Sequence, residues 1–224
     1  MAVTQHDQAL ETFIEKWRAS WPEWRIAEVF VPASQRDTAL AWFALLQELT
    51  EAAWSGTDPA PGLAKLAWWQ EELQGWSQGR RRHPLGALLQ SRPAPWMAFS
   101  AALPALLHLR ALPGDIDDAL ASVRPFAESV MAVEATLLQQ HPAVKNSAIA
   151  LALTSASLMA MHPAVAAGTH PTMRAALTSL WPAPCGPRAR RIAAALVRAR
   201  LSSGASQPLP QWRALWLAWR AARS

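Results

Sequence analysis

Prolines divide this chain into short segments, and none of these segments has the pattern of a β-strand. The chain contains eighteen prolines but only nine glycines, and a proline inside a helix removes a hydrogen bond and clashes with the preceding turn. Between the prolines, apolar residues recur every three or four positions, which predicts amphipathic helices. Alanine, leucine and arginine dominate and β-branched runs are short, which favours helix over sheet. We therefore expect an all-α chain of about ten helices.

A single domain over residues 1–224 is the expected organisation. The sequence is 51% hydrophobic, which is enough for a sizeable core, and it contains no long linker and no internal repeat. Pro125 is expected to divide a helix at 116–123 from another at 126–140. A final helix at 211–222 should follow a hinge at 202–210. Its predicted apolar stripe comprises Trp212, Leu215, Trp216 and Trp219.

The charge and the terminal sequence limit the partners and the compartment. The net charge is +5, and the arginines concentrate at Arg80–Arg82 and at Arg188–Arg200. The second stretch suits an anionic membrane, a diphosphate or nucleic acid, or it is simply a solvated helix face. The single Cys185 forms no internal disulfide, and no apolar run reaches the ~18–20 residues of a membrane span. We expect a cytoplasmic protein with peripheral membrane contact and without nucleic acid as a partner.

The most informative stretch is 63–89, where a helix precedes a basic turn. Leu63, Leu66, Trp69 and Leu73 recur on one helical face. A neighbouring stripe of Lys65, Trp68 and Glu72 could line a cavity instead of the main core. The positive turn suits the negative end of the helix.

Carboxylates are the candidate chemical groups, and metal-ligating patterns are missing. Glu48 and Glu51 are i, i+3 neighbours that could reach one ligand and, with phosphate oxygens, hold Mg²⁺. They could equally be solvated helix residues. The histidines lack HxxxH spacing, so a zinc site is not expected, and several precede proline at helix boundaries. The aspartates at 115–118 suit helix capping.

Three stretches resemble the squalene/phytoene synthase family. Phe-Val-Pro at 30–32 with ALAWFA at 39–44 is similar to the family's "F-L-P…R…A-L-Y-A-F". The run LAWWQEEL at 66–73, followed by His83-Pro84, is similar to "L-x-W-W-R-E-E-L…G…H-P-V". The end of the chain, WLAWRAAR at 216–223, resembles the tails of bacterial members. The resemblance implies an all-helical isoprenoid-synthase bundle.

Active members of that family condense two prenyl diphosphates head to head, with Mg²⁺ held by two aspartate-rich motifs on facing helices. The resemblance aligns the first motif with Gln47, Thr50, Glu51 and Trp54. It aligns the second motif with Ser155, Met159 and Pro163. Only Glu51 keeps a carboxylate, so this chain resembles a degenerate member that lacks both motifs.

Three functions remain open from the sequence. The first is a synthase-like protein without condensation activity and without a resident metal, which binds a prenyl diphosphate or another lipid-like ligand or acts in assembly. Gln-Glu-Leu at 47–49 resembles "A-F-N-x-E-L" in a branch that includes mitochondrial complex I assembly proteins. The second is an active prenyltransferase with Mg²⁺ and catalytic Glu48, Glu51 and Glu72. The third is a basic module that docks on an anionic membrane or on nucleic acid through Arg188–Arg200 and the C-terminal helix. For the first two, the ligand-binding candidates are Gln47, Thr50, Lys65, Trp68 and Trp54.

Overall fold

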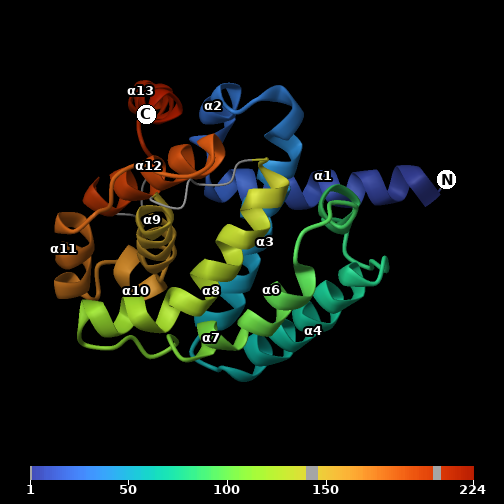
Figure 1. The fold of residues 1–224 in the computed structure, drawn as a ribbon, viewed down its shortest axis with the longest axis horizontal. Coiled ribbons are helices and arrows are strands. Elements are labelled where there is room, and N and C mark those ends of the chain that lie inside the picture. Colours follow the sequence, from blue (N-terminus) through green and yellow to red (C-terminus); the bar gives the residue numbers. More distant parts are fainter. Residues whose placement is uncertain (1, 140–145, 204–207) are drawn as a thin grey trace.

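Helix α3 (Arg36–Trp54) runs through the middle of the molecule, and the other helices surround it (Figure 1). The computed structural model describes residues 2–139, 146–203 and 208–224, with side chains from residue 8 onward. Apolar residues occupy nearly every side of α3, and most of them are buried, as expected of a helix that is hydrophobic all round. The described residues form helices and no strand, which confirms the predicted all-α class.

The helices pack as a series of neighbours around α3. Helix α4 lies between α3 and α6, α6 reaches α8, α8 packs on α9, and α12 lies between α9 and α13. One hydrophobic core extends from Ile14 to Ala221. Within the described ranges, no helix is both long and apolar enough to cross a bilayer. The elements besides α3 are α1 (Ala2–Ser20), α2 (Trp24–Ala27), η1 (Glu28–Phe30), η2 (Ala33–Gln35), α4 (Ala60–Ser77), α5 (Gly86–Leu89), α6 (Trp96–Ala102), α7 (Pro104–Leu107), α8 (Ile116–Leu137), α9 (Ser147–Ala160), α10 (Pro163–Ala166), α11 (Pro171–Ser179), α12 (Arg188–Ser203) and α13 (Gln211–Arg223).

Helix α8 is continuous through Pro125, so the predicted division at this proline is wrong. Pro125 and Ala121 are both exposed, so the Ala121 carbonyl that lacks its usual N–H donor faces solvent. The opposite side of the helix buries a long stripe that includes Val123, Phe126 and Val130. Burying each large apolar side chain contributes about 1.5–3 kcal/mol, which together outweighs the ~3 kcal/mol cost of proline in a helix.

Asp115 caps α8, as the sequence predicts for this aspartate cluster. Its carboxylate accepts hydrogen bonds from the backbone N–H groups of Asp117 at 2.7 Å and Asp118 at 3.4 Å. His162 and His170 similarly cap α10 and α11 through a ring nitrogen that accepts a backbone N–H. His162 and His170 therefore mark helix boundaries, as expected, whereas His141 lies outside the described residues.

The final helix forms at the predicted place but presents the opposite face to the core. Helix α12 ends at Ser203 and α13 begins at Gln211; residues 204–207 of the predicted hinge lie outside the described ranges. The buried residues of α13 are Ala214, Ala218 and Ala221. The predicted apolar stripe of tryptophans and Leu215 is exposed instead. Small residues allow α13 to approach α12 closely, and the large side chains do not fit between them.

Three of the five arginines of α12, namely Arg190, Arg191 and Arg200, bind other parts of the fold, so only part of this stretch is a solvated face. Arg190 is buried in an ion pair with Glu134. Arg200 pairs with the buried Glu23, whose carboxylate also accepts the Leu209 N–H at 2.7 Å. Arg188, near the start of the helix, and Arg198 are exposed.

Candidate functional site

Glu72 is buried in α4, where its carboxylate holds the loop that follows the helix. One oxygen accepts the backbone N–H groups of Arg82 at 2.7 Å and His83 at 2.8 Å, and the Trp76 indole N–H at 2.8 Å. The other accepts Arg82 Nε–H at 2.9 Å. Burial alone would raise the pKa of Glu72, but these donors, His83 N–H foremost, lower it below its ordinary value. Protein donors occupy both oxygens, so this predicted catalytic residue is not free to bind a ligand.

Glu48 and Lys65, predicted as catalytic and ligand-binding residues, pair with each other. The Glu48 carboxylate is buried and contacts Lys65 Nζ, and it lies 3.6 Å from Lys16 Nζ. These contacts join α3 to α4 and to α1. The two charges therefore compensate one another at a helix junction.

Trp68 lies half-buried beside the loop that Glu72 holds. The Arg82 guanidinium lies 5.2 Å from the Trp68 ring centroid. The His83 ring centroid lies 6.0 Å from Trp68, 4.6 Å from Trp69 and 4.9 Å from Phe13. Burial in this aromatic cluster lowers the pKa of His83 to about 4. Trp68 thus belongs to a packed cluster.

Trp54 is the remaining predicted residue that lies in the core. Its indole N–H donates to the Leu106 carbonyl at 2.8 Å, and its ring centroid lies 5.0 Å from that of His162. Burial lowers the pKa of His162 to about 4. These contacts fix the end of α3 against α7 and the start of α10.

The half-buried His83 and the buried His162 predict a loss of stability in mild acid. In the unfolded chain both should titrate near their ordinary pKa of 6.5, whereas in the folded chain they titrate at about 4. The unfolded state therefore binds more protons between these values, and the free energy of unfolding should fall as the pH drops from 6.5 toward 4. Urea unfolding at several pH values measures this slope. The His83→Gln/His162→Gln variant should show a smaller slope between pH 6.5 and 5; an unchanged slope would contradict the assignment.

Gln47, Thr50 and Glu51 line a single cavity of about 260 Å³, here named the Glu51 cavity. Gln47 accepts the Trp21 indole N–H at 2.9 Å and donates its amide N–H to Glu51 Oε1 at 2.6 Å. The Thr50 hydroxyl donates to the Leu46 carbonyl at 3.0 Å. No described donor contacts Glu51 Oε2. Of the predicted residues, these three line the Glu51 cavity, and Gln47 and Glu51 also line a smaller recess of about 30 Å³ together with Glu48.

Most of the other lining residues of the Glu51 cavity come from segments far from α3 in the sequence, and one of them, Pro163, is a position that the resemblance aligns with the second metal motif. Met161 and Pro163 contribute from the end of α9 and the start of α10, and Arg200 contributes from α12. Arg200 Nε–H donates to Glu23 at 2.8 Å, and its guanidinium lies 4.0 Å from the Trp21 ring centroid. The positive charge in the wall is therefore already compensated. No local sequence pattern marks Met161 or Arg200 as lining residues, because only the packing of α3, α10 and α12 brings them to the cavity.

An apolar recess of about 40 Å³ adjoins the Glu51 cavity, and the two share Trp21, Met161 and Val197 as lining residues. Aromatic side chains from α1, α2 and α3 form much of its surface. Trp17, Trp24 and Phe43 are the other aromatic residues that line it. The cavity and the recess thus combine polar groups at one end with an aromatic wall at the other.

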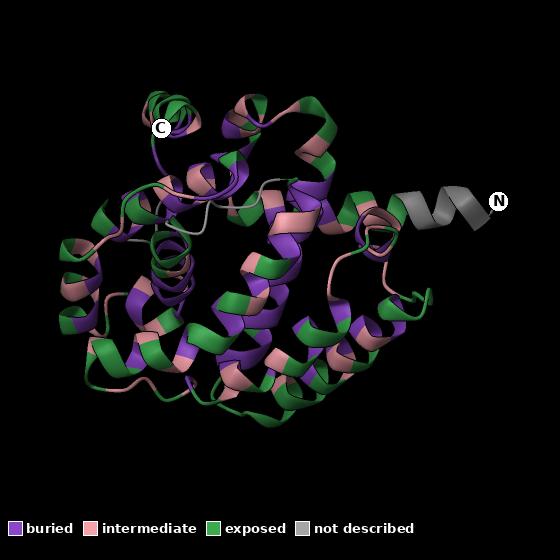
Figure 2. Cartoon of the chain, viewed as in Figure 1, coloured by how far each residue is buried: buried purple, intermediate pink, exposed green. Residues whose placement is uncertain are grey.

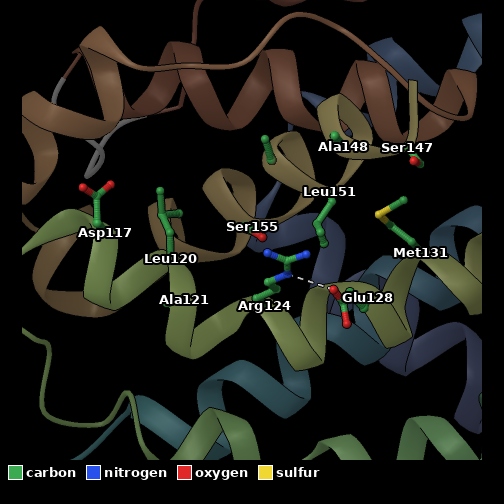
Figure 3. Close-up of a pocket in the computed structure, with 11 residues that line it drawn as sticks. Asp117, Leu120, Ala121, Arg124, Glu128, Met131, Ser147, Ala148, Leu151 and Ser155 are labelled. Atoms are coloured by element: carbon green, nitrogen blue, oxygen red, sulfur yellow. Dashed lines mark hydrogen bonds and ion pairs between the residues drawn. The ribbon is translucent and has the colours of Figure 1, made fainter. Parts of the chain in front are cut away.

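A larger and more open groove of about 690 Å³ lies between α8 and α9 (Figure 3). Arg124 extends across it from α8 toward Ser155 of α9, and Arg124 Nε–H donates to Glu128 at 2.9 Å. Leu120 and Leu151 supply apolar lining from the two helices. The groove contains none of the predicted catalytic or ligand-binding residues. Its charged residues Arg124 and Glu128 pair with each other.

The positions that the resemblance aligns with the second metal motif do not converge. Ser155 lines the α8–α9 groove, Met159 is buried in the core, and Pro163 lines the Glu51 cavity. Glu51 is the one carboxylate among the residues that line that cavity, and the described residues contain no cluster of three acidic, histidine or cysteine side chains suited to a metal. These residues do not fit a cluster of Mg²⁺ ions with two diphosphates. No protein-family model, curated protein or solved structure matches the chain.

Proposed function

We propose that this chain is a squalene/phytoene-synthase-like protein that binds an isoprenoid alcohol or a similar lipid-like ligand in the Glu51 cavity, without metal-assisted condensation. The observation that carries the proposal is the composition of this cavity. One carboxylate, Glu51, lies at its polar side, and an aromatic recess adjoins it. Binding sites for small molecules commonly combine an apolar wall with a few polar groups that fix orientation.

The charges around the cavity favour an uncharged ligand end over a diphosphate. Arg200 is committed to Glu23, so it offers little net attraction to an anion. The negative charge of Glu51 would repel a diphosphate. Mg²⁺ could offset that repulsion, but Glu51 is the one carboxylate among the residues that line the cavity and provides too few ligands to hold the ion. A prenyl alcohol instead could donate its hydroxyl hydrogen to Glu51 while its chain contacts the recess.

The active-synthase alternative has less support. It requires Glu48 and Glu72 beside Glu51, but Glu48 contacts two lysines and Glu72 accepts several N–H groups of the protein. An assembly role needs no ligand in the cavity. Absence of binding by any prenyl compound would therefore favour assembly over the proposed function.

Filling the cavity should abolish ligand binding. Ala166 lines the Glu51 cavity, and Ala167, the next residue, is exposed and does not line it. The Ala166→Phe variant should therefore lose at least about tenfold in affinity for farnesol, because its ring occupies the ligand's volume. Titration calorimetry with farnesol and farnesyl diphosphate measures both affinities, and wild type should prefer farnesol.

The matched control is Ala167→Phe, which adds the same ring outside the cavity. It should bind farnesol as wild type does, and thermal unfolding should show that both variants are folded. Equal farnesol binding by wild type and the Ala166→Phe variant would place the ligand elsewhere and refute the proposed site.

A further inference from the structure

Helix α13 exposes a continuous row of large apolar side chains. Trp212, Leu215, Trp216 and Trp219 are 72%, 46%, 47% and 44% exposed, and together they are named the tryptophan face. Their spacing of three and four residues places them on one side of the helix. Figure 2 shows α13 at the edge of the molecule with an exposed outer side. A contiguous apolar face of this kind marks an interaction surface.

The fold holds α13 so that this face points outward. Ala214, Ala218 and Ala221 form its buried side. Arg191 of α12 donates from Nε to the Ala221 carbonyl at 3.1 Å and from a terminal nitrogen to the Ala222 carbonyl at 3.3 Å. The helix is thus attached through small residues and backbone carbonyls. Leu217 also packs against the core, whereas the four large side chains of the tryptophan face are exposed and remain available to another surface.

Arginines flank the tryptophan face, and α13 carries no acidic residue. The Arg220 guanidinium lies 5.4 Å from the Trp216 ring centroid, and the Arg223 guanidinium lies 4.9 Å from that of Trp219. None of the described residues forms an ion pair with either arginine. Cations that lie against exposed tryptophans combine the two properties that an anionic, partly apolar surface requires.

A groove of about 400 Å³ extends the same surface beside α13. Trp219 and Arg223 line one side of it, and Arg188 at the start of α12 lines another. Val29, which is also exposed, lies across the groove in η1. The positive and apolar character of the tryptophan face therefore continues onto α12 and η1, and it spans more than one helix.

We propose that the tryptophan face docks this protein on the surface of an anionic lipid bilayer. Tryptophan favours the interface between headgroups and acyl chains, where its ring is apolar and its N–H can meet water. Arginine at the border of such a helix meets anionic headgroups. In this arrangement α13 lies in the plane of the membrane surface, with its alanine side against α12. The proposal does not depend on the Glu51 cavity.

Vesicle co-sedimentation of the full chain tests the proposal. Wild type should bind phosphatidylglycerol vesicles more tightly than phosphatidylcholine vesicles, and added salt should weaken the binding. A triple variant, Trp212→Ser/Trp216→Ser/Trp219→Ser, should lose at least about tenfold in affinity. The double variant Arg220→Gln/Arg223→Gln should lose about fivefold for each arginine on anionic vesicles, because each cation near the surface contributes to the attraction.

The matched control removes three exposed apolar side chains from other faces. Leu63→Ser/Met97→Ser/Leu180→Ser should bind vesicles as wild type does, because these residues lie on α4, on α6 and after α11. Equal vesicle binding by wild type and the tryptophan variant would overturn the proposal. The proposal would also be overturned if wild type did not bind vesicles but formed a dimer, or a complex with nucleic acid, and the tryptophan variant did not form it.

Discussion

Replacing Glu134 with alanine should lower the free energy of unfolding by about 3–5 kcal/mol, because it leaves the buried Arg190 without its counter-charge. Glu134 accepts Arg190 Nε–H at 3.0 Å and the Trp42 indole N–H at 2.7 Å. One carboxylate thus joins α8, α12 and the central helix α3. For a chain of this length the melting temperature should fall by about 10 °C. Chemical denaturation followed by circular dichroism measures the change.

The same helix supplies the control for Glu134. Glu128 pairs with Arg124 at 2.9 Å, but both side chains are exposed, and such pairs contribute about 0–1 kcal/mol. Glu128→Ala should therefore change stability by less than about 1 kcal/mol. A Glu134→Ala variant as stable as Glu128→Ala would show that the buried network does not hold the three helices together.

Replacing Glu72 with alanine should have a comparable effect of about 4 kcal/mol, because it leaves the buried Trp76 indole N–H and the part-buried backbone N–H groups of Arg82 and His83 without an acceptor, at about 1–3 kcal/mol each. Glu71 provides a control one residue away, since its side chain is exposed and lies 3.6 Å from Arg82. Glu71→Ala should cost less than about 1 kcal/mol. Equal unfolding free energies for the two variants would refute the role of Glu72.

The effect of Glu72 should also depend on pH. Its pKa is lowered in the folded state, so its contribution is present above its ordinary pKa and is lost as the pH falls through the folded value. Wild type and the Glu72→Ala variant should therefore converge in stability in strong acid. A constant difference down to the lowest pH at which both fold would contradict this account.

The helices could be predicted from the sequence because proline spacing and apolar periodicity are local properties. Pro125 shows the limit of that reasoning: whether a proline ends a helix depends on how much apolar surface the helix buries on its far side. Helix α13 shows another limit. Its tryptophans form a regular stripe, but periodicity does not say which of two faces meets the core, and the alanine face allows the closer approach to α12.

The candidate site was predictable only where its residues share a helix. Gln47, Thr50 and Glu51 lie together in the structure because α3 places them on adjoining positions. Glu72 has a recognisable motif around it, yet three of its four donor groups belong to Arg82 and His83, in a loop ten residues later that folds back against α4. Arg200 and Met161 reach the cavity through tertiary packing, which no local pattern encodes.

The fate of farnesyl diphosphate incubated with the protein and Mg²⁺ tests the central claim most directly. Mass spectrometry of the mixture should show intact farnesyl diphosphate, no released diphosphate and no condensed hydrocarbon, and farnesol added to the mixture should be retained with the protein. The same retention should be lost in the Ala166→Phe variant. Condensed product that forms with Mg²⁺ and disappears in the Glu51→Gln variant would contradict the claim and identify an active prenyltransferase.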